Sequence, residues 1–186
     1  MISPATHDPT PRVRVRRLRE SDRSAFRALR LAALAADPAA FGSSLERESR
    51  YTDDRWSDWV RRGATSSDEA TWVAEELGGP LVGMIGVFRK DDASQVWGLW
   101  VAGDRRHTGI GAALLDALLA WTRSTRPGAQ VRLEVAPSQK AAIRLYRARG
   151  FLPTGKRRPL ESRPEVLAEE FVRRGEDARA PAQDGP

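Results

Sequence analysis

Residues 101–118 have the sequence VAGDRRHTGIGAALLDAL. An apolar, strand-like run leads here through a turn rich in glycine and arginine into a run whose leucines recur at helical spacing. The backbone N–H groups of a helix's first turn lack intrahelical partners, and the helix dipole makes that end positive. Because Gly109 and Gly111 have no Cβ, their main chain can approach a phosphate closely, and Arg105 and Arg106 can add positive charge. The stretch therefore predicts an anion-binding turn at the start of a helix.

Several phosphate ligands and one purely structural interpretation fit this turn. No lysine follows the last glycine, so the pattern of a P-loop nucleotide hydrolase fails. The dinucleotide-binding pattern GxGxxG also fits poorly, because Leu114 stands where the third small residue is needed. In addition, the predicted strand ends near Ala102, well before Gly109. The structural alternative is that the glycines only shape a turn between strand and helix.

The first third of the chain predicts one strand and two helices. VRVRRL at residues 13–18 alternates like a strand. Ser21 offers an N-cap for a helix that runs to about Ala36, where the following Asp-Pro pair ends it. We interpret FGSSLERE at residues 41–48 as a loop and TDDRWSDWVRR at residues 52–62 as the second helix.

The rest of the chain predicts a sheet with further helices. TWVAEE, LVGMIGVFR and SQVWGLWVA are strand-like and separated by turn residues, which predicts an antiparallel meander over residues 71–102. A helix from residue 110, the strand VRLEVA, a helix capped by Ser138 and closed near Gly150, and a strand from Phe151 follow. The final segment EVLAEEFVRR fits a strand or a helix. This order predicts an α/β fold with a mixed, mostly antiparallel sheet flanked by helices.

Composition limits the class of protein. With 186 residues, 40% of them hydrophobic, the chain suits a single domain, which we expect at residues 12–173. Residues 1–11 and 174–186 are expected to be disordered tails. The lack of cysteine excludes disulfides and thiolate nucleophiles, and two isolated histidines predict no metal site. No signal peptide or long apolar run occurs, so we expect a cytoplasmic protein without a membrane partner.

Two sequence blocks resemble one enzyme family. RRHTGIGAALL fits the signature (Q/R)xxGx(G/A), with Arg106, Gly109 and Gly111 at its defined positions. LEVAPSQKAAIRLYRARGF, at residues 133–151, is similar to the second conserved block of the same family. LRLAALAADPAAFGSSLERE, at residues 29–48, resembles the first helix and following loop of many members. On these motifs the chain resembles the GNAT superfamily of N-acetyltransferases over roughly residues 13–172.

The resemblance implies acetyl-CoA as the co-substrate, without a metal. Its pyrophosphate would lie on the main chain of residues 106–112, and its pantetheine arm would pair with the backbone near the end of the strand SQVWGLWVA. The residues expected to bind it are Leu99, Trp100, Val101, Arg106, His107, Thr108, Gly109, Ile110, Gly111, Ala112 and Gln139. Gln139 departs from the asparagine that many relatives have there, so its contact is an open question.

The resemblance also implies two catalytic roles. Tyr146 aligns with a tyrosine that many members place near the thioester sulfur, where a phenol can protonate the departing thiolate. Packing of a helical tyrosine on the sheet is the alternative. The attacking amine must lose a proton, because an alkylamine with a pKa of about 10 is mostly protonated at neutral pH. Glu134 is our first candidate for the base. No spacing rule separates it from the other candidates, which are Glu75, Glu76, Glu46, Glu48 and a water chain.

We predict an N-acetyltransferase that moves the acetyl group of acetyl-CoA to a primary amine by direct attack. The acceptor, a small molecule or a protein, is not specified by the sequence. A sensor or interaction module that binds acyl-CoA without turnover is the alternative. The net charge of +6 and the segment RVRVRR would suit a nucleic-acid-binding protein, but no recognition motif accompanies them, so we expect no nucleic-acid partner. The C-terminal strands would suit a homodimer.

Overall fold

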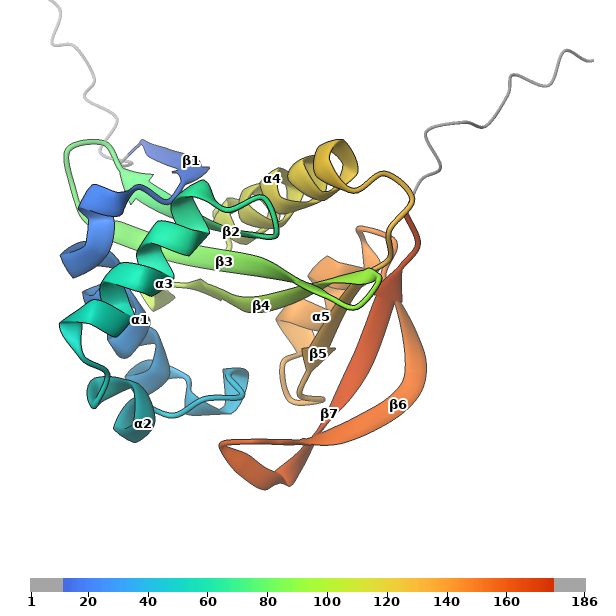
Figure 1. Cartoon of the computed structure of the whole chain (residues 1–186). Coiled ribbons are helices and arrows are strands. Elements are labelled where there is room, and N and C mark those ends of the chain that lie inside the picture. Colours follow the sequence, from blue (N-terminus) through green and yellow to red (C-terminus); the bar gives the residue numbers. More distant parts are fainter. Residues whose placement is uncertain (1–11, 176–186) are drawn as a thin grey trace, which may run out of the picture.

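One seven-stranded sheet organises the chain, of which the computed structural model describes residues 12–175 (Figure 1). The strands are β1 Val13–Arg17, β2 Glu69–Glu76, β3 Leu81–Lys90, β4 Ala93–Val101, β5 Val131–Val135, β6 Leu152–Leu160 and β7 Arg163–Arg173. Their order is β1-β2-β3-β4-β5-β7-β6, and only the pair β4/β5 is parallel. The predicted mixed, mostly antiparallel sheet and its central meander are confirmed, and the ambiguous final segment is a strand.

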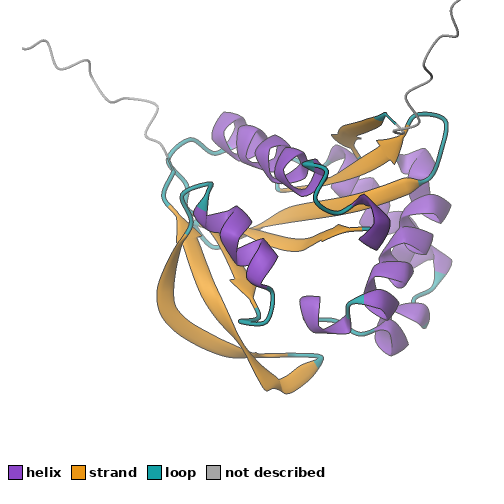
Figure 2. Cartoon of the chain, turned by 180° about the vertical axis from the view of Figure 1, so that it is seen from behind, coloured by secondary structure: helices purple, strands orange, loops and turns teal. Residues whose placement is uncertain are grey.

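Helices cover both faces of this sheet (Figures 1 and 2). They are α1 Arg23–Ala36, α2 Leu45–Ser49, α3 Asp53–Thr65, α4 Ile110–Thr125 and α5 Lys140–Arg147. Leucines of α4 and Tyr146 of α5 pack on one face of the sheet, with Trp72 and Leu133. Phe26 of α1 and Trp56 of α3 belong to a second core on the other face. Period-2 alternation along the strands supplies both cores.

A β-bulge in β4 changes which face its side chains point to. Gly86 pairs with Trp97 and Met84 pairs with Trp100, so β4 has one residue more than β3 between these pairs. Gly98, in the bulge, has a φ of +67°, and a Cβ there would lie 3.3 Å from Arg30 Nη1. Glycine therefore suits this position for both reasons. Because of the extra residue, Trp100 lies in the core of the α1/α3 face.

Strands β4 and β5 pair only over a short stretch. Ser94 pairs with Val131 and Gln95 with Arg132, and no further pair joins the two strands. Beyond Gln95, the edge of β4 that faces β5 thus has no strand partner among residues 12–175. The sheet opens at its centre, with backbone N–H and C=O groups available to a ligand.

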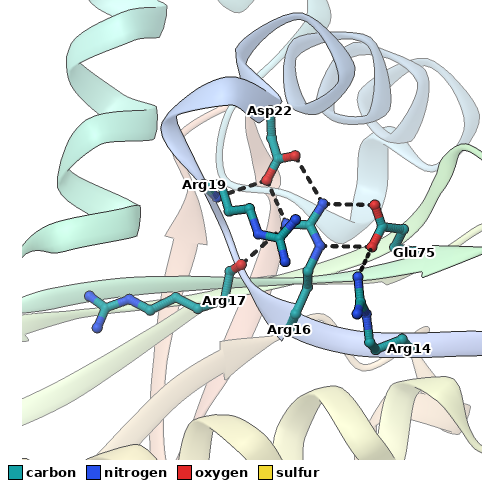
Figure 3. Close-up of polar contacts among 6 residues, drawn as sticks. All are labelled: Arg14, Arg16, Arg17, Arg19, Asp22 and Glu75. Carbon is teal, nitrogen blue, oxygen red and sulfur yellow. Dashed lines mark hydrogen bonds and ion pairs between the residues drawn. The ribbon is translucent and has the colours of Figure 1, made fainter.

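An arginine-rich network fixes the entry into α1 and explains a failed prediction (Figure 3). Asp22, beside the predicted cap Ser21, binds Arg16 at 2.6 and 2.9 Å, and residues 20–22 form a 3₁₀ turn so that α1 begins at Arg23. Burial opposes ionisation of Asp22, but the hydrogen bonds from Arg16 and from the Arg19 N–H, together with the charges of both arginines, outweigh it and lower its pKa. The prediction that Ser21 caps this helix is wrong, because the ion pair determines the turn.

The same arginine reaches the second strand. Arg16 also binds Glu75 through two hydrogen bonds of 2.8 and 3.0 Å, and Arg14 adds a third at 2.9 Å (Figure 3). These hydrogen bonds, first those from Arg16, lower the pKa of Glu75 to about 2. They raise the pKa of Arg16 in turn. The network ties β1, β2 and the turn before α1 together.

Two further local predictions fail. Residues 41–48, expected to be a loop, contain the start of α2, whose N-cap Ser44 accepts a 3.2 Å hydrogen bond from the backbone of Arg47. Helix α5 begins after Gln139, and the side chain of the predicted cap Ser138 makes no capping bond, while its carbonyl accepts from the Lys140 N–H. Gly150, with a φ of +79°, lies in the turn that follows α5, as its sequence position suggested.

Two further predictions concern the ends of the chain and a membrane-spanning helix. The tails predicted at residues 1–11 and 174–186 lie outside the described residues, apart from residues 174 and 175. Within residues 12–175, no helix combines the length and the apolar character needed to cross a bilayer.

Candidate active site

The glycine turn forms a helix start that relies on its main chain. A short 3₁₀ turn, Gly103–Arg105, follows β4, and His107 and Gly109 adopt left-handed conformations with φ of +65° and +86°. Gly109 is the N-cap of α4, and no side chain caps this helix. The N–H groups of the first helical turn, including those of Gly111 and Ala112, therefore have no intrahelical acceptor. This is the anion-binding geometry that the sequence predicts.

The arginines of the turn are occupied by carboxylates. Arg105 Nε donates to Glu76 at 2.5 Å, and its Nη1 donates to Asp104 at 2.8 Å. Arg106 forms an ion pair with Asp37, and its Nε donates to the carbonyl of Val101 at 3.0 Å. Both side chains therefore brace the turn, and its backbone is the part left free for an anion.

Asp37 is a residue whose importance the sequence did not indicate. The same oxygen, Oδ2, accepts the indole N–H of Trp100 at 2.7 Å and the Arg106 guanidinium. Asp37 thereby connects the end of α1 to the end of β4 and to the glycine turn. In the sequence it was visible only as the Asp-Pro pair that ends a helix, because its partners lie more than sixty residues away.

The remaining residues of the predicted donor site surround the opening between β4 and β5. Leu99 and Val101 pack at the edge of the α4-face core, and Ile110 is buried in it. Thr108 Oγ1 donates to the carbonyl of Arg105 at 2.6 Å, which stabilises the turn. Gln139 lies half-buried at the start of α5, and its side chain makes no hydrogen bond within the described part of the chain.

A cavity of about 810 Å³ lies on the α1/α3 side of this opening. Trp97 and Gly98 of β4 line it together with Glu134 of β5. Its aromatic wall consists of Phe41, Tyr51, Trp59, Phe88 and Trp97. The segment after α1, helices α2 and α3, and the β6–β7 hairpin complete it, so residues from 30 to 161 contribute.

Two of the candidate bases lie in other parts of the molecule. Glu75 is held by Arg14 and Arg16 in the β1–β2 network. Glu76 is paired with Arg105. Neither carboxylate lines the cavity, so the structure separates both from the opening between β4 and β5.

The other three candidates differ in their surroundings. Glu46 is exposed, pairs with Arg50 at 2.8 Å and does not line the cavity. Glu48 lines it, but the side chain is 2% exposed and binds Arg30 with hydrogen bonds of 2.7 and 2.9 Å. Glu134 lines the cavity, is exposed to it and has no partner among residues 12–175. Of the five carboxylates, Glu134 alone is free to accept a proton in the cavity.

Tyr146 lies on the opposite side of the sheet from Glu134. Its ring packs against Phe151 in the α4-face core, and burial raises the pKa of its hydroxyl, which stays protonated at neutral pH. No hydrogen bond within residues 12–175 engages this hydroxyl. The Tyr146 oxygen is not fully enclosed. The fully enclosed side-chain polar atoms without a hydrogen-bond partner in that range are Arg30 Nη1, Ser43 Oγ and Trp56 Nε1. The Tyr146 hydroxyl keeps a proton to donate. The described residues contain no cluster of His, Cys, Asp and Glu that could hold a metal.

Comparison with known proteins gives a consistent result. The model of the acetyltransferase (GNAT) family matches residues 25–151. Among curated proteins, none matches the chain in sequence.

Several solved structures share the fold. YncA from Salmonella typhimurium, solved with its cofactor acetyl-CoA, is 18% identical with a TM-score of 0.72, over 92% of this chain and 99% of YncA. The spermidine N-acetyltransferase from Vibrio cholerae, solved with CoA and spermine, is 14% identical with a TM-score of 0.69, over 88% and 95% of the two chains. The ribosomal-protein-S18-alanine N-acetyltransferase from Escherichia coli is 17% identical with a TM-score of 0.64, over 91% and 97%. Since the family model matches more than half of its residues, the chain belongs to the GNAT family of acetyltransferases.

Proposed function

We propose that this protein transfers the acetyl group of acetyl-CoA to a primary amine by direct attack. The observation that carries the proposal is the edge of β4 that lacks a strand partner beyond Gln95 among the described residues. The cavity lined by Trp97 and Gly98 of β4 holds the unpaired carboxylate of Glu134, and α4, with its free N–H groups, begins soon after β4 ends. Acetyl-CoA occupies the similar fold of Salmonella YncA, which supports the choice of donor.

The donor site of this proposal consists mainly of backbone. The N–H groups of residues 106–112 bind the pyrophosphate, with the helix dipole favouring its negative charge. The free edge of β4 at residues 99–101 hydrogen-bonds the pantetheine arm, as an added strand would. The side-chain amide of Gln139, which has no partner within residues 12–175, lies at the start of α5 and can bind the same arm.

The chemistry follows from the positions of Glu134 and Tyr146. Bound acetyl-CoA supplies an activated thioester carbonyl. Glu134 accepts a proton from the ammonium group of the acceptor, and the neutral nitrogen then forms the new C–N bond at the carbonyl carbon. As the C–S bond breaks, the Tyr146 hydroxyl donates its proton to the departing thiolate. The second proton, which the nitrogen loses as the amide forms, passes through water and restores the Tyr146 hydroxyl. Because the two side chains lie on opposite faces of the sheet, proton removal and proton donation occur on opposite sides of the thioester.

An acyl-CoA sensor without turnover is less well supported, because such a module would not need an unpaired carboxylate in a cavity beside the donor opening. A cytoplasmic location and a homodimer stay predictions.

The deciding experiment is a screen of amines with acetyl-CoA, in which free thiol and product mass are both measured. An enzyme releases CoA and forms an acetylated amine, whereas a sensor binds acetyl-CoA without either. Glu134→Gln is expected to lower kcat/KM by about 10²-fold, with the loss greatest where the acceptor amine is protonated. Glu46→Gln is the control, because Glu46 lies outside the cavity. Wild-type activity of Glu134→Gln would remove this residue from the mechanism.

A further inference from the structure

The charges that line the cavity restrict the acceptor, provided that the proposed function holds. We propose that the acceptor is a small molecule with a primary amine and a separate anionic group, such as a carboxylate. In this proposal, Glu134 binds the ammonium group, and the unpaired cations Lys90 and Arg158 on either side of it attract the anion.

Most of the charged side chains in the cavity neutralise one another. Arg30 pairs with Glu48 at 2.7 Å and Arg62 with Glu69 at 2.9 Å. A longer contact of 3.6 Å joins Arg89 to Asp68, and Arg47 forms an ion pair with Glu161. These eight residues all line the cavity, and together they contribute no net charge.

Three charged side chains of the lining are left over. Glu134, Lys90 and Arg158 have no hydrogen-bond or ion-pair partner within residues 12–175. Lys90 ends β3 and Arg158 lies on β6, so in the sheet order they stand on either side of β5, which carries Glu134. One free carboxylate between two free cations matches a molecule with one ammonium group and one anionic group. It disfavours a polyamine, whose second ammonium group would meet positive charge.

The β6–β7 turn limits the size of the acceptor. Ser162 Oγ donates to the carbonyl of Phe41 at 2.8 Å, and the Arg47–Glu161 ion pair lies beside it. These contacts connect the tip of the hairpin to the segment after α1 and to α2, and Figure 2 shows the hairpin curving toward that helix. A polypeptide could not be laid across the cavity at this point without breaking them. A cavity of about 810 Å³ is the size that small molecules use.

The test compares matched acceptors. Glycine, β-alanine, 4-aminobutyrate and 6-aminohexanoate, the eighteen chiral L-amino acids that have a primary amine, and the primary amide of each are assayed with saturating acetyl-CoA. A diamine of each chain length and a lysine-containing peptide complete the set. For at least one carboxylate we expect a kcat/KM about tenfold or more above that of its amide, mainly through KM, because charge-assisted hydrogen bonds are lost in the amide.

Variants assign the preference to its residues. Arg158→Gln and Lys90→Gln should each reduce the ratio of kcat/KM for the carboxylate to kcat/KM for its amide. Arg157→Gln is the matched control, because it removes a neighbouring charge of the same strand that does not line the cavity. If Arg157→Gln has the same effect as Arg158→Gln, general charge and not the cavity causes the preference, and the proposal is wrong.

The outcomes separate this inference from the proposed function. Faster acetylation of amides, diamines or the peptide than of every carboxylate would overturn the inference and confirm the transferase. Calorimetric binding of acetyl-CoA without acetylation of any acceptor would indicate the sensor and overturn both the inference and the proposed transferase. Failure to bind acetyl-CoA at all would overturn the proposed function itself.

Discussion

The donor turn and the acceptor cavity are built on different principles. The turn consists of consecutive residues from Leu99 to Ala112, and its binding groups are backbone N–H groups at the start of α4. The cavity is made from side chains of segments spread between residues 30 and 161, held by ion pairs such as Arg30–Glu48. A site made of backbone depends on conformation and open space. A site made of side chains depends on contacts that any single substitution can remove.

This contrast predicts where the protein is most sensitive. We expect the largest loss of stability when Glu48 is removed from the buried ion pair of the cavity. Removal of the Tyr146 hydroxyl should lower kcat, and substitution of Gly109 or Gly111 should have smaller effects. Substitution of Glu75, in the β1–β2 network distant from both regions, should have the smallest effect on stability.

Glu48→Ala should have the largest effect. It leaves the Arg30 guanidinium, which is 95% buried, without its carboxylate, and Arg30 Nη1 already has no partner within residues 12–175. Removing one member of a buried pair costs about 3 to 5 kcal/mol. Urea unfolding of both proteins measures the loss.

The control for this pair is Glu46→Ala, which removes an exposed carboxylate of the same helix and should cost less than about 1 kcal/mol. The double variant Arg30→Met with Glu48→Leu should recover much of the loss, since both charges are then absent. Equal stability of Glu48→Ala and wild type would show that the cavity does not depend on this pair.

Tyr146→Phe tests the proposed proton donor. Phenylalanine keeps the ring packing against Phe151 and removes the proton donor. We expect kcat to fall by about 10- to 100-fold with acetyl-CoA affinity unchanged, because a proton donated only in the transition state does not affect ground-state binding. Single-turnover kinetics with a saturating acceptor provide the measurement, so that product release does not limit the rate. An unchanged rate would make Tyr146 a packing residue.

The two glycines of the turn should differ from each other. Gly109 has a φ of +86°, so Gly109→Ala introduces strain and should lower the stability by about 1 to 2 kcal/mol. A Cβ at Gly111 would lie 3.6 Å from Leu145 and 3.8 Å from Val101, in ordinary contact beside the opening. Gly111→Val should therefore leave the fold intact and weaken acetyl-CoA binding by about tenfold, as calorimetric titration can show. Unchanged affinity in Gly111→Val would place the pyrophosphate elsewhere.

Glu75→Gln should have the smallest effect, and one that depends on pH. The pKa of Glu75 is lowered from 4.5 to about 2 by Arg16 and Arg14, so its ionised form stabilises the fold. The difference in unfolding free energy between wild type and variant, about 1 kcal/mol, should be complete above pH 4.5 and disappear as the pH falls through about 2. Glu165→Gln, which removes an exposed carboxylate paired with Arg163, is the control and should change the unfolding free energy by less than about 1 kcal/mol. A difference that persists at pH 2 would contradict the assignment.

Helices and strands were predicted correctly where the hydrophobic pattern extends over many residues. Predictions that depended on one or a few residues failed. The meander and the leucine stripe of α4 extend over many residues, and tertiary packing reinforces both. The caps expected at Ser21 and Ser138 were wrong, because each prediction depended on one side chain, and the helices begin later, at Arg23 and Lys140. The short helix α2 was missed since five residues carry little periodicity.

The sequence by itself determined the fold class, the family and the glycine turn. Hydrophobic periodicity, turn residues and motif spacing indicate all three, and each of these patterns can be read along the chain. The tertiary structure alone separated Glu134 from Glu48, Glu75 and Glu76, found the role of Asp37 and revealed the bridge from Ser162 to Phe41. Whether a carboxylate is free or paired depends on an arginine that can lie anywhere in the chain. No local sequence pattern indicates which arginine pairs with which carboxylate.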